Sequence, residues 1–533
     1  MLKTTYLKPL RDANTELRPG FKSRLAQILK AHSSFKIDNG HKHKLESIME
    51  EANSEIEKYF MKDYEDGRSI KSDVEGILSR FYDVKDSDKA NTNVAVTPSN
   101  LKSILNRLSL DTNSINLGLG NMNLLFIATE LILLENSTSI NFRGPHITLI
   151  EELEAHLHTQ AQIRLVKHLE EIVQESNTTQ FILTSHSTNL VSSINPNKLI
   201  YLYDGIAHPL SKEYTLLEDD DYRFLERFLD STKSNLFFAK GLILVEGDSE
   251  MLLLPAISEL IGIPLHQYGI SLVNIGGTSF ERYVKLFSTM AEPTIKLPIS
   301  LITDMDVKPK VYYDVEDKKI YLINDENKQD VEGLIGKTIE VDIIGKEYSK
   351  IDDLQKSLKI EESDFKEKLK EKTELAITKE KIEERITAKR RKIEEKYSKY
   401  NANIQVSISP EWTLEYCLLL SPLQKLLKES ILETQYKTPF NPTTQRKIDE
   451  IDRALADPDE KLITIYRLFK RLDDKEVSKA IVAQTLANKI IDLSREEKDS
   501  LKNEITNDVH MKYLIDAIIK ASGKQNKEDG IIE

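Results

Sequence analysis

The sequence has 533 residues, of which 40% are hydrophobic, so it is long enough to fold into two to four domains. Its formal net charge of −13 argues against a protein that coats nucleic acid by charge alone. The single cysteine, Cys417, excludes a disulfide framework and is typical of a reducing compartment. No apolar run is long enough for a membrane span, and no charged-then-apolar leader opens the sequence. We therefore expect a cytoplasmic protein with no membrane partner.

The first informative stretch follows a mostly helical region that ends near residue 110. A glycine-rich turn, LGLGN, precedes an apolar helix expected over residues 122–134. An apolar strand over 146–150 then ends in Glu151 and Glu152, and a later strand ends in Thr184-Ser185-His186. Backbone amides of a glycine-rich turn at a helix N-terminus bind phosphate. Two acids and a histidine at strand ends could hold Mg²⁺, orient water and contact the γ-phosphate, so the set suggests ATP hydrolysis.

The second informative stretch is GLILVEGDSE, at residues 241–250. Its apolar run, 242–245, reads as a buried strand that ends in Glu246, and a helix-like run carrying Glu250 follows. A second apolar strand over 299–302 leads into Asp304 and Asp306. Alternate residues of a strand share one face, so these two aspartates are expected to point the same way. Carboxylates at two strand ends predict a hard-oxygen site for Mg²⁺ or Mn²⁺; a plain helix cap or solvated turn is the alternative.

Residues 310–401 are interpreted as an insertion. KVYYDVEDKKIYLIND alternates like a hairpin with its turn at Glu316-Asp317, and KTIEVDIIG reads as another hairpin. Residues 351–400 form a highly charged helical region. One interpretation is a solvated helical hairpin. The other is a DNA- or partner-binding arm that uses Lys389, Arg390, Arg391 and Lys392.

These motifs together resemble a known family. LGLGN, ITLIEE, EAHLH and TSHS resemble the signature, Walker B, D-loop and switch histidine of the C-terminal half of an ABC-type ATPase. LVEGDSE with the later TDMD resembles a toprim domain. Their combination looks like the OLD (overcoming lysogenisation defect) nucleases, which implies an α/β chain with an ATPase portion fused to a toprim domain. The implied parts are ATPase over 1–235, toprim core over 236–310, insertion over 311–401, and toprim completion with C-terminal helices over 402–533.

The resemblance also assigns site residues. It implies a further toprim acid at Glu415, with Glu411 as runner-up, and a lysine near the scissile phosphate at Lys479. Three sets of candidates follow. The catalytic set is Glu246, Asp304, Asp306, Lys479 and Glu152; the metal set is Glu246, Glu250, Asp304, Asp306 and Glu415; the nucleotide set is Gly118, Gly120, Asn121, Glu151, Glu152 and His186.

A phosphate loop of the form G-x-x-x-x-G-K-[ST] does not precede the signature. The near match, Gly336-Lys337-Thr338, has Val331 where the first glycine belongs and lies beyond the toprim acids, so we do not expect it to bind phosphate. The family would carry this loop upstream of Met1. We interpret the sequence as a fragment; an ATPase half that is degenerate, or completed by another polypeptide, is the alternative.

The expected function is a metal-dependent DNA endonuclease linked to an ABC-type ATPase, acting in defence against phage or foreign DNA. Its cofactors would be one or two Mg²⁺ or Mn²⁺ ions per toprim site, with Mg²⁺-ATP where the missing half is present. Its partners would be DNA, a second copy in a homodimer or higher even oligomer, and a second defence protein. The rivals are a scaffold or sensor without turnover, a topoisomerase and a primase. No tyrosine is marked as a nucleophile, and one cysteine cannot form a zinc set.

Overall fold

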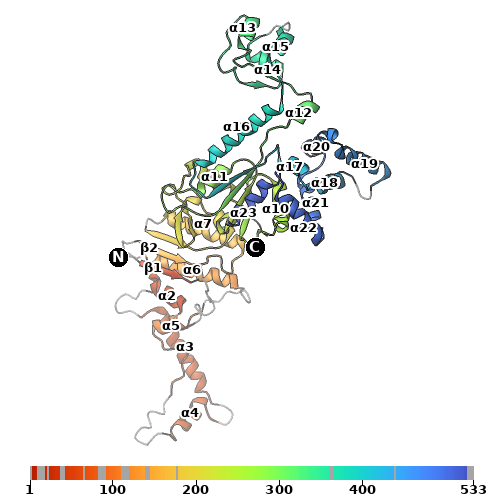
Figure 1. Cartoon of the computed structure of the whole chain (residues 1–533). Helices are drawn as coiled ribbons and strands as arrows, with labels where there is room; N and C mark the ends of the chain where they lie inside the picture. Colours follow the sequence, from red (N-terminus) through yellow and green to blue (C-terminus); the bar gives the residue numbers. More distant parts are fainter. Residues whose placement is uncertain are drawn as a thin grey trace. The chain divides into compact units, whose positions relative to one another are not determined.

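The computed structural model describes residues 3–8, 19–20, 23–35, 42–63, 67–81, 92–109, 119–137, 145–175, 178–360, 365–436 and 440–524. The chain forms two compact units, Met1–Ser193 and Ile194–Glu533, and each contains its own parallel sheet (Figure 1). Residues 194–235, which were expected in the ATPase portion, fall in the second unit. Within the described ranges, no helix is long and apolar enough to cross a bilayer.

The first unit is built on a sheet of three parallel strands in the order β1-β2-β3. The strand expected over 146–150 is confirmed as β2, and the helix expected over 122–134 lies within α6. α7 buries Ala161, Leu165 and Leu169, which recur every fourth residue and so share one helix face. The elements are β1 Lys3–Leu7, α2 Arg24–Ala31, η1 Ser33–Phe35, α3 Lys44–Phe60, α4 Ile70–Leu78, α5 Leu101–Arg107, α6 Leu119–Ser137, β2 His146–Ile150, α7 Thr159–Glu175, β3 Thr179–Leu183 and α8 Thr188–Ser192.

The second unit is built on four parallel strands in the order β12-β8-β6-β7. The central strand, β6, is buried at all five positions, which explains why its sequence is apolar throughout rather than alternating. α23 lies against β6, β8 and β12, while α10 lies against β7 and α21. The strands are β6 Gly241–Val245, β7 Ile270–Asn274, β8 Ile299–Thr303 and β12 Ile404–Ile408; the two helices over them are α10 Asp248–Leu260 and α23 Lys512–Ala521.

The remaining elements of the second unit lie before, between and after these strands. α11, Phe280–Leu286, follows β7 and lies between it and β8 in the chain. The elements that precede β8 in the chain are η3 Pro196–Lys198, β4 Ile200–Tyr203, β5 Ile206–Pro209, α9 Asp219–Phe228, η4 Lys233–Phe238 and α11 Phe280–Leu286. The C-terminal helices are α17 Leu414–Leu420, α18 Gln424–Gln435, α19 Pro442–Ala456, α20 Pro458–Asp473, α21 Lys479–Asp492 and α22 Arg495–Thr506.

The insertion departs from the predicted hairpins. The turn at Glu316-Asp317 is present, but the segment before it is a helix, α12, because Tyr312 packs its ring against Trp412 and Tyr466. β9 pairs instead with two short strands further along the chain. The insertion consists of α12 Lys310–Val315, β9 Ile320–Leu322, α13 Lys328–Ile335, β10 Glu347–Tyr348, α14 Ile351–Ser357, α15 Phe365–Thr373, β11 Glu374–Leu375 and α16 Lys379–Ser398.

The segment KTIEVDIIG is not a hairpin either. Ile339 and Ile343 are both buried in the core of the insertion, whereas Val341 is 85% exposed. Residues 337–345, all of them described, contain no strand, and 341–345 form a turn. Gly336 follows the last turn of α13 in a left-handed conformation. A phosphate loop precedes a helix N-terminus, whereas Gly336-Lys337-Thr338 follows a helix, and its lack of phosphate binding stays a prediction.

Candidate functional site

Four carboxylates gather at the carboxyl edge of the β12-β8-β6-β7 sheet. Glu246 directly follows β6 and Asp304 directly follows β8, and these two strands are parallel neighbours. Glu250 lies in the first turn of α10, and Glu415 lies in the first turn of α17. The carboxyl ends of parallel strands, with the helix N-termini that follow them, are where open α/β sheets place their ligands. We call Glu246, Glu250, Asp304 and Glu415 the acidic cluster.

Hydrogen bonds hold carboxylates of the acidic cluster in place. The Thr303 hydroxyl donates to Glu246 Oε1, and the Leu414 amide donates to Asp304 Oδ1 at 2.9 Å. Glu415 is more heavily bound. Its Oε2 accepts from Thr413 Oγ1 at 3.1 Å and from Lys479 Nζ at 3.3 Å, and its Oε1 accepts from Ser249 Oγ at 3.4 Å. The structure thus brings Lys479, on α21, to the acidic cluster.

Burial and mutual repulsion raise pKa values within the acidic cluster. Burial raises the pKa of Asp304 to about 8, and the charges of Glu415, Glu250 and Glu246 add to the effect. Burial likewise raises the pKa of Glu250 to about 7, with Glu415 and Glu246 as further causes. Burial also raises the pKa of Glu246. Such groups oppose ionisation together unless a cation neutralises them.

Asp306 does not share the strand geometry predicted for it. β8 ends at Thr303, and Asp306 adopts a left-handed φ of 53°, so strand alternation does not relate it to Asp304. Its amide donates to the Trp412 carbonyl at 2.8 Å, which fixes this turn, and its side chain is 55% exposed. Asp306 nevertheless raises the pKa of Glu246, so it lies near the acidic cluster, on its solvent side.

The donor atoms of the acidic cluster suit a divalent cation in their chemistry, but their arrangement without a metal ion is not a complete site. In the described part of the chain, no three histidine, cysteine, aspartate or glutamate side chains form a preformed metal-binding group. The acidic cluster offers oxygen ligands alone, which suit Mg²⁺ or Mn²⁺, and its raised pKa values are those that a bound cation would lower. Glu411 is a weaker candidate, because burial alone raises its pKa and no carboxylate of the acidic cluster contributes.

Two residues near this site, Asn274 and Tyr513, are not among the candidates taken from the sequence. Asn274, at the end of β7, donates from Nδ2 to Asp248 Oδ1 at 2.7 Å. The Tyr513 phenol, on α23, is buried, and burial raises its pKa with further contributions from Asp304, Glu250 and Glu415. Asn274 follows the strand-end pattern and could have been found from it. Tyr513 carries no such signal, because α23 is brought to the site only by the fold.

The first unit brings its own predicted residues to one sheet edge. Glu151 and Glu152 follow β2, and His186 follows β3, its parallel neighbour. The Glu152 amide donates to Thr184 Oγ1 at 3.2 Å, and the His186 amide donates to Glu154 Oε1 at 2.6 Å, so the two loops are linked.

The glycine-rich turn is described in part. A side chain at Gly120 would place its Cβ 2.4 Å from the carbonyl oxygen of His156, so the start of α6 lies against the segment EAHLH. The Asn123 amide group donates to the Ala155 carbonyl at 2.6 Å in the same contact. Gly118 and the side chain of Asn121 lie outside the described residues.

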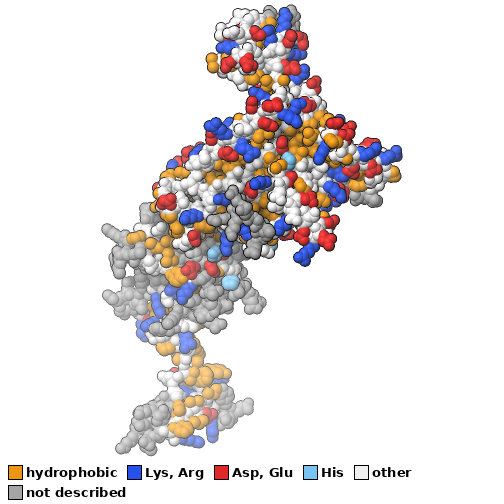
Figure 2. Space-filling model, in the orientation of Figure 1, with side chains coloured by type: hydrophobic (Ala, Val, Ile, Leu, Met, Phe, Trp, Pro, Cys, Tyr) orange, Lys and Arg blue, Asp and Glu red, His pale blue; other side chains and the backbone are white. Residues whose placement is uncertain are grey.

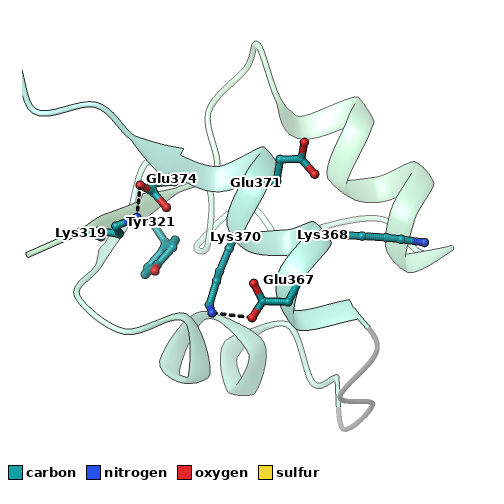
Figure 3. A pocket seen from close by; sticks show the side chains of 7 residues that line it. All are labelled: Lys319, Tyr321, Glu367, Lys368, Lys370, Glu371 and Glu374. Carbon is teal, nitrogen blue, oxygen red and sulfur yellow. Dashed lines mark hydrogen bonds and ion pairs between the residues drawn. The ribbon is translucent and has the colours of Figure 1, made fainter.

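A pocket in the insertion is separate from the acidic cluster. Four of its charged side chains form two ion pairs, Lys319 with Glu374 at 2.8 Å and Lys370 with Glu367 at 2.6 Å (Figure 3). It contains none of the residues predicted from the sequence. Its lining consists of Lys319, Tyr321, Glu367, Lys368, Lys370, Glu371 and Glu374.

The raised pKa values give a stability test without a metal ion. The folded state holds protons on Asp304 and Glu250 up to about pH 8 and 7, whereas the unfolded chain releases them near their ordinary pKa values of 3.8 and 4.5. The stability that these protons contribute is therefore complete below about pH 4 and is lost as pH rises towards 8. Thermal melts in EDTA should show the second unit losing stability over this range, and Asp304→Asn should lose less. Melting temperatures that fall by the same amount with pH in the two proteins would contradict the raised pKa of Asp304.

Comparison with known proteins assigns both units. Residues 3–191 match the AAA ATPase domain family, and residues 237–306 match the family described as overcoming lysogenization defect protein-like, TOPRIM domain. Endonuclease GajA of Bacillus cereus strain HuB5-5 is 27% identical over 217 residues, which are 36% of this chain and 31% of that protein. Endonuclease GajA of strain VD045 is 29% identical over 164 residues, 31% of this chain and 27% of that protein. The matched region thus spans about a third of the length of these relatives or less.

Two solved structures are also similar. The C-terminal region of the Xanthomonas campestris pv. campestris OLD protein is 22% identical, with a TM-score of 0.27, over 54% of this chain and 95% of that one. The C-terminal region of the Burkholderia pseudomallei OLD protein is 22% identical, with a TM-score of 0.25, over 53% of this chain and 99% of that one.

Proposed function

We propose that this chain, which belongs to the OLD family of ATPase–TOPRIM proteins, is a divalent-metal-dependent DNA endonuclease that cleaves at the acidic cluster. The observation that carries the proposal is the gathering of four buried or half-buried carboxylates beside a lysine at the carboxyl edge of a parallel sheet. The similarity to two proteins named endonuclease GajA supports the same reaction class.

The residues of the site have distinct roles in this proposal. Glu246, Glu250, Asp304, Asp306 and Glu415 would hold one or two Mg²⁺ or Mn²⁺ ions. Bound there, such ions supply a nucleophilic water at neutral pH and neutralise charge on the phosphate. Thr303 and Thr413 orient the carboxylates of Glu246 and Glu415 through their hydroxyls. The Leu414 amide donates to the Asp304 carboxylate, so the chain itself holds this ligand in position.

Lys479 would contact the scissile phosphate. Its ammonium lies 3.3 Å from Glu415 and its side chain is 39% exposed, so it stands at the acidic cluster and is open to a substrate. A fixed cation at this place stabilises the charge that develops on the phosphate oxygens in the transition state.

The test is conversion of supercoiled plasmid to nicked and linear forms in Mg²⁺ or Mn²⁺, with EDTA as the blank. Lys479→Gln should lower the cleavage rate by roughly 10²–10³, the loss typical of one charge-stabilising group. Lys489→Gln is the matched control, because Lys489 lies on the same helix and pairs with Glu433 at 2.8 Å, away from the acidic cluster. No cleavage by the unmutated chain, or equal losses in the two variants, would count against the proposal.

A second candidate is a scaffold or sensor that binds nucleotide or nucleic acid without turnover. The observation in its favour is that no preformed metal-binding group exists among the described residues. The plasmid assay separates the two functions, because a scaffold would bind DNA and leave it intact in every metal tested.

The first unit would couple this reaction to nucleotide. Glu151, Glu152 and His186, with the glycine-rich turn of Gly118, Gly120 and Asn121, are proposed to bind ATP, with Glu152 orienting water. One chain carries a single LGLGN signature. An ABC-type site shared between two copies would therefore require a homodimer or higher even oligomer. We place the activity in the cytoplasm, in defence against phage or foreign DNA, with a second defence protein as partner.

A further inference from the structure

The helix α16 carries one lysine on its inward face. Ile382, Ile386, Ile393 and Tyr397 follow one another at helical spacing; Ile382 and Tyr397 are buried, and the two between are half-buried. Lys389 lies seven residues after Ile382, on the same stripe, and is half-buried itself. Residues two turns apart share a helix face, so a lysine stands where the pattern calls for an apolar side chain.

Lys389 reaches the acidic site from this position. Its ammonium lies 3.5 Å from Asp306 Oδ2, and its charge also lowers the pKa of Glu246. Lys479 makes the equivalent contact with Glu415. Two ammonium groups from different helices, α16 and α21, therefore each pair with one carboxylate of the site.

Other basic side chains of α16 pair away from the acidic site. Arg385 pairs with Glu347 at 2.6 Å, Arg391 with Glu395 at 2.7 Å, and Lys396 with Glu281 at 3.5 Å. Figure 2 shows basic and acidic side chains interspersed over the visible surface, without a broad basic face. A nucleic-acid contact of α16 therefore has to come from individual cations rather than from a uniformly charged arm.

A divalent cation would change the balance at Lys389. Asp306 needs no ammonium once its charge is neutralised by a metal ion, and Lys389, 37% exposed, is then available to another anion. The anion that a nuclease brings to this place is the phosphodiester backbone.

We propose that Lys389 is a second phosphate contact of the cleavage site, which binds the DNA backbone on the Asp306 side while Lys479 binds it on the Glu415 side. This inference rests on the proposed function and extends it, because it assigns the insertion a place in substrate binding. It also separates Lys389 from Arg390, Arg391 and Lys392, with which the sequence alone groups it.

The test measures binding of a short fluorescent DNA duplex by anisotropy over a series of salt concentrations, in Ca²⁺, which takes oxygen ligands as Mn²⁺ does and so occupies an intact acidic cluster. The unmutated chain is the background, and a gel of each sample checks that the duplex stays uncut. The plot of log affinity against log salt concentration falls, and Lys389→Gln should make it shallower by about 0.9, the share of one phosphate contact. The same variant should weaken binding about 5–10-fold near 0.1 M salt. Lys389→Arg should keep both slope and affinity, because it keeps the charge.

Lys381→Gln is the matched control. Lys381 lies on the same helix, is 39% exposed and pairs with Glu384 at 3.1 Å, so it loses a similar ion pair away from the site. Exposed pairs of this kind contribute little to stability, so all these variants should melt like their parent. An unchanged slope in Lys389→Gln, or an equal change in Lys381→Gln, would overturn the assignment.

Failure of the proposed function gives a different pattern. A chain that binds the duplex but never cuts plasmid would remove the nuclease assignment, and the salt slopes would still decide whether Lys389 contacts phosphate. A chain that does not bind DNA would contradict both the proposed nuclease function and the assignment of Lys389 as a phosphate contact.

Discussion

Replacing Asp304 with asparagine should abolish metal-dependent cleavage while making the metal-free protein more stable. The pKa of Asp304 is raised to about 8, because its carboxyl group is buried and three other carboxylates surround it. Asparagine keeps the shape and can still accept from the Leu414 amide, but it removes the charge that a divalent ion requires. The loss should exceed the roughly 10–100-fold that follows from mutating a residue that only orients a metal ligand.

The experiment combines plasmid cleavage with thermal melts in EDTA at pH 8. Glu411→Gln is the matched control, because Glu411 is also half-buried near α17 but does not raise the pKa of Asp304 or Glu250. Full activity in Asp304→Asn would remove the acidic cluster from catalysis. A lower melting temperature than that of the unmutated protein would show that asparagine disrupts the fold and that the loss of activity has another cause.

Replacing Gly241 with alanine should disrupt the second unit. Gly241 begins the buried central strand β6, and a Cβ there would lie 1.8 Å from the carbonyl oxygen of Ala521, at the end of α23. The clash is with backbone, so no side-chain rotation relieves it, and α23 or β6 must move. Overpacking typically costs about 1–3 kcal/mol and this contact is at the severe end, so we expect about 3 kcal/mol or more.

Gly333→Ala is the control for this substitution. Gly333 lies inside α13 with no atom within 4 Å of an added Cβ, so alanine should stabilise that helix by about 0.5–1 kcal/mol. Denaturant unfolding followed by far-UV circular dichroism, with soluble yield, measures both variants. A Gly241→Ala protein that unfolds at the same denaturant concentration as the unmutated chain would show that α23 does not pack on β6 as described.

Much of the acidic site could be predicted from local sequence. An apolar run of strand length that ends in an acid indicates both a buried strand and a carboxylate at its carboxyl end, which is how Glu246 and Asp304 are found. Glu415 and Lys479 have no comparable pattern of their own. Family resemblance alone assigns them, and the structure places them 3.3 Å apart at the same site.

The parts that could not be predicted depend on long-range contacts. α12 alternates like a strand, but Tyr312 finds aromatic partners far away in the sequence, and that packing selects the helix. Asp306 leaves the strand direction because its amide meets the carbonyl of Trp412, which lies beyond the insertion. Lys389 is brought to Asp306 across most of the insertion. Local propensity contains none of this information.

The measurement that tests the central claim most directly is a calorimetric titration of the metal-free chain with Mn²⁺ at about pH 7.5, repeated in buffers of different ionisation enthalpy. At this pH, which lies between the pKa values of about 8 for Asp304 and about 7 for Glu250, the acidic cluster still holds protons that a bound cation must displace. Saturable binding should therefore release protons, and Asp304→Asn should bind more weakly and release fewer. Absence of saturable binding, or equal binding and proton release in the two proteins, would contradict the assignment of the acidic cluster as the metal site of a nuclease.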